Sequence, residues 1–283
     1  MTDIFEFDQR THSYGLMGNP VAHSRSPQIH QLFAEQFGIR LEYMRIQVDA
    51  GGFGQAVSNF EARGGCGLNI TVPFKSEAWQ LADECTDRAE LAQAVNTLTL
   101  NRDGRRLGDN TDGIGLVRDI TANLACPVRA KRVLLVGAGG AAQGVLGPVL
   151  DEAPELLWVA NRTVDRAESL AKRHAAHGAV TGCGFDTLTG NRFDIVINAT
   201  SASLSGSVPP LPGSLFADDA LAYDLMYADT ATPFVEWAQA HGAAQVADGL
   251  GMLVEQAAES FHIWHAHSPD TTAVMAALRS GMA

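Results

Sequence analysis

The chain has 283 residues, of which 46% are hydrophobic and 18% are charged, and its formal net charge at pH 7 is −12. This composition is typical of a folded globular protein with about two domains and excludes extensive disorder. The acidic balance disfavours nucleic acid or an anionic membrane as a partner, because neither would meet a basic surface. A small anion would have to be bound by local groups.

The amino-terminal residues 1–6 contain no basic or apolar leader pattern, so we expect no signal peptide. The cysteines follow neither a metal-ligand spacing nor a C-x-x-C spacing, and they are Cys66, Cys85, Cys126 and Cys183. We therefore expect reduced thiols, no metal site and a cytoplasmic protein.

The first predicted elements are a strand over residues 14–17 and a helix that ends at Gly38. Ser26 is the natural N-cap of this helix and Pro27 its first helical residue. Plain capping is one interpretation of the two serines in this loop. The other is that Ser24 and Ser26, beside the free N–H groups of a helix start, bind a small anion such as a carboxylate.

A strand over 41–48, a helix over 53–62 and a buried strand over 67–70 come next. Pro73 then reads as the first residue of a helix, which places Lys75 in the first helical turn. A cation there opposes the helix dipole at a cost of about 0.3 to 1 kcal/mol. The placement suggests a functional lysine, and the alternative is a solvated lysine whose stem covers apolar neighbours.

The pattern from residue 79 to 94 predicts one further helix, and residues 95–100 predict a strand with Asn96 near its start. A hairpin turn is expected at 101–104.

A polar loop over 108–113 precedes an apolar helical pattern over 114–124. By itself Asp112 is an ordinary helix-start residue.

A second unit begins with a strand over 131–136 and the G-x-G-x-x-A turn of residues 137–142, followed by another strand at 156–160. The apolar run 133–150 contains five glycines, a glutamine and a proline, which fits strand, turn and helix better than a membrane span. We predict a dinucleotide site here, with a glycine-rich packing turn as the alternative.

The residues after that strand, Asn161-Arg162-Thr163, indicate which dinucleotide is used. An NAD site would carry a carboxylate at this point for the ribose 2′-hydroxyl, and none is present. Arg162 and Arg166 instead offer guanidinium groups for a 2′-phosphate, which favours NADP over two merely solvated arginines.

Strands at 193–198, 222–227 and 244–247 continue a parallel α/β alternation. The final helical pattern, from 252 to about 264, has no strand of this unit left to cover, so we expect it to return to the first unit. On this helix Gln256 could contact a ligand, although the sequence alone favours exposure.

In combination and in this order, the motifs resemble the shikimate dehydrogenase family from about Tyr14 to the carboxyl end. The motifs that carry the resemblance are Gly18-Asn19-Pro20 with Ser24-Arg25-Ser26-Pro27, Asn69 to Lys75, Ala94 to Thr97, Gly108 to Gly113, the glycine turn, Asn161 to Thr163, and Asp248 to Leu253. One departure is Ala92-Gln93-Ala94, where the family commonly has a glycine before Ala-Val-Asn-Thr.

The resemblance implies two α/β domains with a cleft between them. Residues 1–112, completed by helices within 250–283, would form the substrate domain, and 113–249 a Rossmann-type NADP domain. The implied activity is reversible reduction of 3-dehydroshikimate to shikimate by NADPH, in aromatic amino acid (chorismate) biosynthesis. Alternatives are a shikimate/quinate or aminoshikimate dehydrogenase, or a catalytically silent NADPH sensor. The oligomeric state is left open, with a homodimer among the options.

The resemblance also implies site residues. Those for substrate are Ser24, Ser26, Thr71, Lys75, Asn96, Asp112, Tyr227 and Gln256. Those for NADP are Gly137, Ala138, Gly139, Gly140, Ala141, Asn161, Arg162, Thr163, Arg166, Leu225 and Gly249, with Asp87 as a weaker candidate. Because hydride delivery builds negative charge on a ketone oxygen, we expect Lys75 to act as the acid and Asp112 to orient it.

Overall fold

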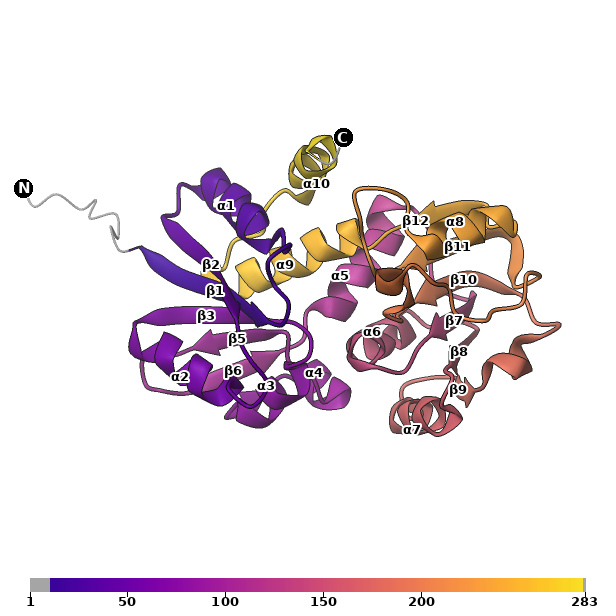
Figure 1. The fold of residues 1–283 in the computed structure, drawn as a ribbon, viewed down its shortest axis with the longest axis horizontal. Helices are drawn as coiled ribbons and strands as arrows, with labels where there is room; N and C mark the ends of the chain where they lie inside the picture. The colour runs from indigo at the N-terminus through magenta and orange to yellow at the C-terminus, as the bar shows by residue number, and fades with distance from the viewer. Residues whose placement is uncertain (1–10, 282–283) are drawn as a thin grey trace, which may run out of the picture.

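The computed structural model describes residues 11–281. The amino-terminal stretch in which no signal peptide is expected lies outside the described residues. Two six-stranded sheets with their helices form the two halves of the molecule (Figure 1). Within the described residues, no helix is both long enough and apolar enough to cross a membrane.

The first sheet has the strand order β2-β1-β3-β5-β6-β4, in which β5 runs antiparallel to both of its neighbours. Its strands are β1 (His12–Gly18), β2 (Leu41–Gln47), β3 (Gly65–Ile70), β4 (Glu84–Cys85), β5 (Thr97–Leu100) and β6 (Arg106–Asp109). Its helices are α1 (Ser26–Phe37), α2 (Phe53–Ala62), α3 (Lys75–Leu81) and α4 (Asp87–Ala92).

Two predicted helix starts are wrong by one or two residues. Helix α1 begins at Ser26, whose backbone N–H donates to Ser24 Oγ at 3.2 Å, so Ser26 is not the N-cap. Helix α3 begins at Lys75 with Phe74 as its cap, so Pro73 precedes the helix. Lys75 still lies in the first turn, as expected.

The single helix predicted over 79–94 is wrong, because the chain forms α3, β4 and α4 there. Strand β4 pairs in parallel with β6, and this backbone pairing to a distant segment replaces helical hydrogen bonds. Thr86 then caps α4 by accepting the Ala89 N–H at 3.4 Å. A local pattern carries no information on such a partner, since β6 follows later in the chain.

The second sheet is parallel throughout, with the order β12-β11-β10-β7-β8-β9. Its strands are β7 (Arg132–Val136), β8 (Leu156–Ala160), β9 (Val180–Cys183), β10 (Phe193–Asn198), β11 (Phe216–Asp224) and β12 (Gln245–Ala247). Its helices are α6 (Gly140–Asp151), α7 (Val164–His174) and α8 (Pro233–Ala240). Buried apolar clusters lie on both faces, as a parallel sheet requires. Sequence reasoning missed β9 and began β11 six residues late.

Helices α5 (Asp112–Arg118), continued by the π-helical η1 (Asp119–Asn123), and α9 (Leu250–His265) connect the halves side by side (Figure 1). At Gly115 an added Cβ would lie 2.6 Å from the Gln256 backbone nitrogen, so only glycine permits this approach. Helices α9 and α10 (Thr271–Ser280) pack on α1 through one buried cluster. This packing agrees with the expected return of the last helices to the first unit.

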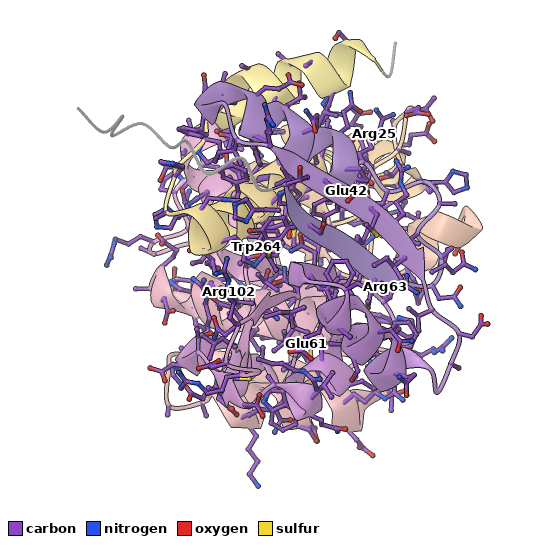
Figure 2. The ribbon with its side chains drawn as sticks, turned by 90° about the vertical axis from the view of Figure 1, so that its left-hand side faces the viewer. Arg25, Glu42, Glu61, Arg63, Arg102 and Trp264 are labelled. Carbon is purple, nitrogen blue, oxygen red and sulfur yellow. The ribbon has the colours of Figure 1, made fainter. Side chains whose placement is uncertain are left out.

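Trp264 fixes the end of α9 to the first sheet. Figure 2 shows this residue beside the strands of that sheet. The indole stacks on Tyr14 with ring centroids 4.6 Å apart and donates to the Leu98 carbonyl at 3.3 Å. An added Cβ at Gly67 would come within 2.6 Å of the indole nitrogen, so that glycine in β3 makes the room.

Candidate active site

A cleft of about 540 Å³ separates the two halves. On the side of the first sheet it is lined by Val72, Pro73, Lys75 and Ser76. On the side of the second sheet it is lined by Ala138, Gly139, Gly140, Gln143, Asp165, Arg166, Ser169, Leu170 and Arg173. The predicted lysine and the glycine turn therefore face the same space.

Lys75 and Asp112 form an ion pair, with Nζ 2.5 Å from Oδ2 and side chains only 15% and 8% exposed. Each residue is the first of its helix, α3 and α5. The helix start suits the aspartate and opposes the lysine. The second carboxylate oxygen, Oδ1, accepts from Asn96 Nδ2 at 2.8 Å. Both oxygens of Asp112 are thus engaged, and the lysine is held at a fixed point on the cleft wall.

Asn96 is the centre of the polar network behind this pair. Its amide also donates to Thr111 Oγ1 at 2.9 Å and to Gln256 Oε1 at 3.3 Å. Its Oδ1 accepts the Thr111 backbone N–H at 2.8 Å. The predicted exposure of Gln256 is therefore wrong: the residue is partly buried, because α9 crosses α5 at this point.

Five further buried or partly buried polar residues were not selected from the sequence. Asn69 Nδ2 donates to Ser260 Oγ at 3.0 Å and to Thr97 Oγ1 at 3.2 Å, and Tyr43 donates to Asn69 Oδ1 at 2.7 Å. The fifth of these residues is Thr111, whose contacts with Asn96 are given above. Asn69, Thr97 and Thr111 lie inside the sequence motifs that carry the family resemblance, and their position there is a signal that could have identified them. Tyr43 and Ser260 sit in ordinary strand and helix patterns without such a signal.

A charged clamp supports the loop that carries Asp112. Arg88 binds both oxygens of buried Asp109, with Nε–Oδ1 at 2.6 Å and Nη2–Oδ2 at 2.7 Å. Glu259 on α9 pairs with Arg88 at 3.3 Å and with Arg118 on α5 at 2.7 Å. Asp109 Oδ1 also accepts the Asn110 backbone N–H at 2.7 Å. This clamp joins α4, β6, α5 and α9 directly behind the ion pair.

The two candidate serines lie next to each other where the chain enters α1, with Ser24 on the loop and Ser26 as the first residue of the helix. Ser24 donates its hydroxyl to Ser26 Oγ at 3.1 Å, and Ser26 is buried. Burial raises the pKa of Tyr227, while the nearby Arg25 backbone and the Arg25 and Arg45 charges oppose that rise. Arg25, labelled in Figure 2, also pairs with Asp229 of the other half at 2.8 Å. The structure thus brings Tyr227 to the serine loop.

Thr71 is partly buried in the segment between β3 and α3, and its backbone N–H donates to the Met17 carbonyl at 2.9 Å. An added Cβ at Gly18 would collide with Thr71 Cγ2, so this glycine allows the segment to lie against β1. The backbone of Thr71, four residues before Lys75, is therefore fixed against β1.

The glycine turn has the features of a phosphate cradle. Gly137 has φ +110°, and an added Cβ would be 3.1 Å from the Ala199 carbonyl oxygen. At Gly139 and Gly140 an added Cβ would meet no atom within 4 Å, so the backbone is open toward the cleft. Helix α6 starts at Gly140 without a side-chain cap, which leaves N–H groups for an anion. Ala138 and Ala141 anchor the turn on the core. The residues present fit a dinucleotide pyrophosphate.

The loop after β8 holds the candidates for the adenosine end. Asn161 Nδ2 donates to the Thr163 carbonyl at 2.9 Å and closes the loop. Arg162 and Arg166 are exposed, and Arg166 lines the cleft whereas Arg162 is not among its lining residues. Asp87 is exposed at the start of α4 and is also outside the cleft lining.

Leu225 and Gly249 come together where two segments follow β11 and β12. An added Cβ at Gly249 would collide with the Leu225 carbonyl oxygen, so only glycine fits. The preceding Asp224 is buried and accepts hydroxyls from Ser203 and Thr232, each at 2.7 Å. Burial raises the pKa of Asp224, and these hydrogen bonds oppose that rise. Asp224, which sequence reasoning missed, fixes the start of the segment that carries Leu225 and Tyr227.

A Rossmann-type half whose glycine turn faces a buried lysine–aspartate pair across a cleft defines a two-domain, dinucleotide-dependent oxidoreductase. Three family models match this chain: the shikimate dehydrogenase substrate binding domain over residues 16–98, shikimate/quinate 5-dehydrogenase over 119–205, and the shikimate 5′-dehydrogenase C-terminal domain over 249–279. The chain belongs to the shikimate dehydrogenase family.

Similar proteins extend this match over 95% of the chain. A protein of Alkalilimnicola ehrlichii named shikimate dehydrogenase (NADP(+)) is 56% identical over 95% of this chain and 99% of its own. The crystal structure of an Ael1 enzyme from Pseudomonas putida is 46% identical, with a TM-score of 0.89 over 95% of this chain and 98% of that one. Shikimate 5-dehydrogenase from Thermus thermophilus, in complex with NADP(H) and shikimate, is 30% identical, with a TM-score of 0.84 over 95% and 99%.

Proposed function

We propose that this protein is an NADP-dependent shikimate dehydrogenase, which reversibly reduces 3-dehydroshikimate to shikimate in aromatic amino acid biosynthesis. The observation that carries the proposal is the Lys75–Asp112 pair, 2.5 Å apart on a cleft shared with the glycine turn. The names of the relatives, shikimate dehydrogenase (NADP(+)), support the choice of substrate and cofactor.

In this proposal the substrate domain comprises residues 1–112 with helices from 250–283, and the NADP domain comprises 113–249. The substrate carboxylate would be held by Ser24 and Ser26 at the start of α1 and by Tyr227, which follows β11 and lies near Arg25. The ring hydroxyls would be held by Thr71, Lys75, Asn96, Asp112 and Gln256. Four of these five share the hydrogen-bond network around Asn96, which supports a common role.

The NADP phosphates would be held by the backbone of residues 137–141, where the open glycines fit a pyrophosphate. Asn161, Thr163, Arg162 and Arg166 would hold the adenosine end, where guanidinium groups suit the 2′-phosphate. Leu225 and Gly249 would adjoin the nicotinamide. Asp87 stays a weaker candidate, because it is exposed outside the cleft lining.

NADPH, when bound, supplies a hydride to the substrate ketone. Negative charge then develops on the ketone oxygen, and the Lys75 ammonium stabilises that charge and donates the proton that makes the hydroxyl. Asp112 keeps Nζ in place, while Asn96 keeps Asp112 in place. In the oxidation direction a neutral Lys75 takes the hydroxyl proton.

We also propose a cytoplasmic protein with no nucleic-acid partner, which the net charge of −12 supports. A homodimer is the assembly to be tested by sedimentation at several protein concentrations, where a single monomeric species would reject it.

The decisive test is a steady-state assay of the purified protein with shikimate or quinate and with NADP or NAD. We expect shikimate-dependent reduction of NADP at a kcat/KM well above that of the other three pairs. A preference for quinate, or for aminoshikimate in a parallel assay, would favour the related dehydrogenases. NADPH binding without turnover on any of these substrates would instead favour a silent sensor.

A further inference from the structure

Gln93, at the carboxyl end of α4, has an unusual backbone conformation for its side chain. It is the C-cap of α4, with φ +50° in the left-handed region. Glycine is the residue that takes this conformation without steric cost. Six non-glycine residues in the described chain have positive φ, and Gln93 alone among them has a long side chain. Because the cap itself would be better served by glycine, the side chain of Gln93 should have a separate use.

The side chain of Gln93 reaches the other half of the molecule. Arg173, in the last turn of α7, donates from Nη1 to Gln93 Oε1 at 2.8 Å. Arg173 also lines the cleft, as does Arg166 two turns earlier on the same helix. One hydrogen bond therefore joins the end of α4 to the helix that forms the outer wall of the NADP side.

A second contact close to Gln93, made by Leu91, packs α4 against the NADP side of the cleft. Leu91 of α4 packs so closely on α6 that a Cβ at Gly147 would lie 3.1 Å from Leu91 Cδ2. Helix α6 is the helix that begins at the glycine turn. Helix α4 thus contacts α6 through an apolar side chain and α7 through the Gln93–Arg173 hydrogen bond, and the two helices bound the proposed cofactor site.

We propose that Gln93 is a positioning residue for NADP: by holding Arg173, it keeps α7 and Arg166 in place along the cleft. This inference rests on the proposed function, because it assigns Arg166 to the cofactor 2′-phosphate. Gln93 is not among the residues that line the cleft, so its loss should weaken cofactor binding and leave the chemical step intact. The strained backbone predicts the opposite sign for stability, since glycine at this position relieves the left-handed conformation.

The test compares the Gln93→Gly and Arg173→Met variants and their combination in the full-length protein. NADPH dissociation constants come from calorimetric titration, and kcat and both KM values from the turnover assay. We expect each single variant to raise the NADPH dissociation constant by about three- to tenfold, in line with the modest net contribution of one exposed hydrogen bond. The double variant should show no larger rise than either single variant, because both remove the same contact. The kcat and the KM for shikimate should stay within about twofold, and Gln93→Gly should melt at or above the wild-type temperature.

Lys172→Met is the matched control, because it removes a positive charge from the same turn of α7 at an exposed position outside the cleft lining. It should leave NADPH binding unchanged. Unchanged NADPH binding in Gln93→Gly, or additive effects in the double variant, would overturn the inference and leave the proposed function standing. If the wild-type protein fails to bind NADPH at all, the proposed function fails and the inference fails with it.

Discussion

The two walls of the cleft are built in opposite ways. On the substrate side, Asn96 and Asp112 are buried and bonded to other side chains. On the cofactor side, the turn at Gly139 and Gly140 presents bare backbone to open space. The arginines of that side, Arg162 and Arg166, are exposed.

This difference matches the two kinds of recognition that the proposed function requires. Main-chain N–H groups at a helix start bind a phosphate without specific side chains, so one contiguous turn suffices. A ring with several hydroxyls needs side-chain atoms at fixed positions, and in the proposed function these come from α3, the residue before β5, α5 and α9. Changes on the substrate wall should therefore affect turnover and stability, and changes on the cofactor wall should affect cofactor affinity.

The largest expected effect is on the substrate wall at Lys75. Replacing Lys75 by Ala removes the proposed proton donor and should lower kcat by about 10²- to 10⁴-fold. Circular dichroism should show an unchanged fold, and Lys172→Ala, an exposed lysine, should turn over normally. A near-normal kcat in Lys75→Ala would refute the acid/base role.

The clamp behind that wall should matter for stability. Arg88→Met leaves the buried carboxylate of Asp109 without its bidentate partner, and we expect a loss of about 2 to 4 kcal/mol in the free energy of unfolding. Urea denaturation measures the loss. Arg105→Met is the control, because its side chain is 58% exposed and solvent screens its ion pairs, so its loss in the free energy of unfolding should be much smaller. Equal losses in the two variants would mean that the clamp has no special role.

On the cofactor wall, the double variant Arg162→Gln/Arg166→Gln should reduce the preference for NADP over NAD by about 10- to 100-fold. The loss should come from a higher KM for NADP, because neither arginine takes part in the described hydrogen-bond network around Lys75 and Asp112. The measurement is kcat/KM for both cofactors, with the exposed Arg129→Gln as a charge control. An unchanged ratio would exclude these arginines from cofactor selection.

The smallest expected effect is on the pH dependence of the free energy of unfolding, through a buried histidine in the substrate half. His30 is buried and stacks on Tyr43 at 4.4 Å, and burial lowers its pKa from 6.5 to about 3. Between these values the unfolded chain binds a proton that the folded chain does not, so stability falls as pH falls below about 6.5. From pH 7 to pH 6 the proton uptake of this histidine on unfolding should lower the free energy of unfolding by something under about 1 kcal/mol.

In His30→Phe that acid-dependent loss should be smaller, as measured by urea denaturation at the two pH values. The exposed His177→Gln serves as the control and should keep the wild-type slope. An unchanged slope in His30→Phe would show that His30 does not titrate on unfolding as proposed.

The features that the sequence predicted are those that depend on nearby residues. The strand, glycine turn and helix from 132 to 151 follow from a local pattern, and so does Lys75 in a first helical turn. Non-local contacts decide the rest. The split of 79–94 depends on pairing with β6, and the burial of Gln256 depends on α9 packing against Gly115. Ser260 has no sequence signal because a serine on a helix is ordinary until its partners are known.

The return of α9 to the first half also affects the order in which this protein can fold during synthesis. Ile29 and Phe33 of α1 bury themselves against Val254 and Phe261, which leave the ribosome more than 220 residues later. The parallel sheet, by contrast, has all of its strands by residue 247. Although domains usually fold from the amino terminus onward, the first half of this chain must wait with α1 unpacked while the second half completes its sheet. A chain that ends before α9 and has been released from the ribosome should therefore protect the later half from protease while leaving α1 open to cleavage.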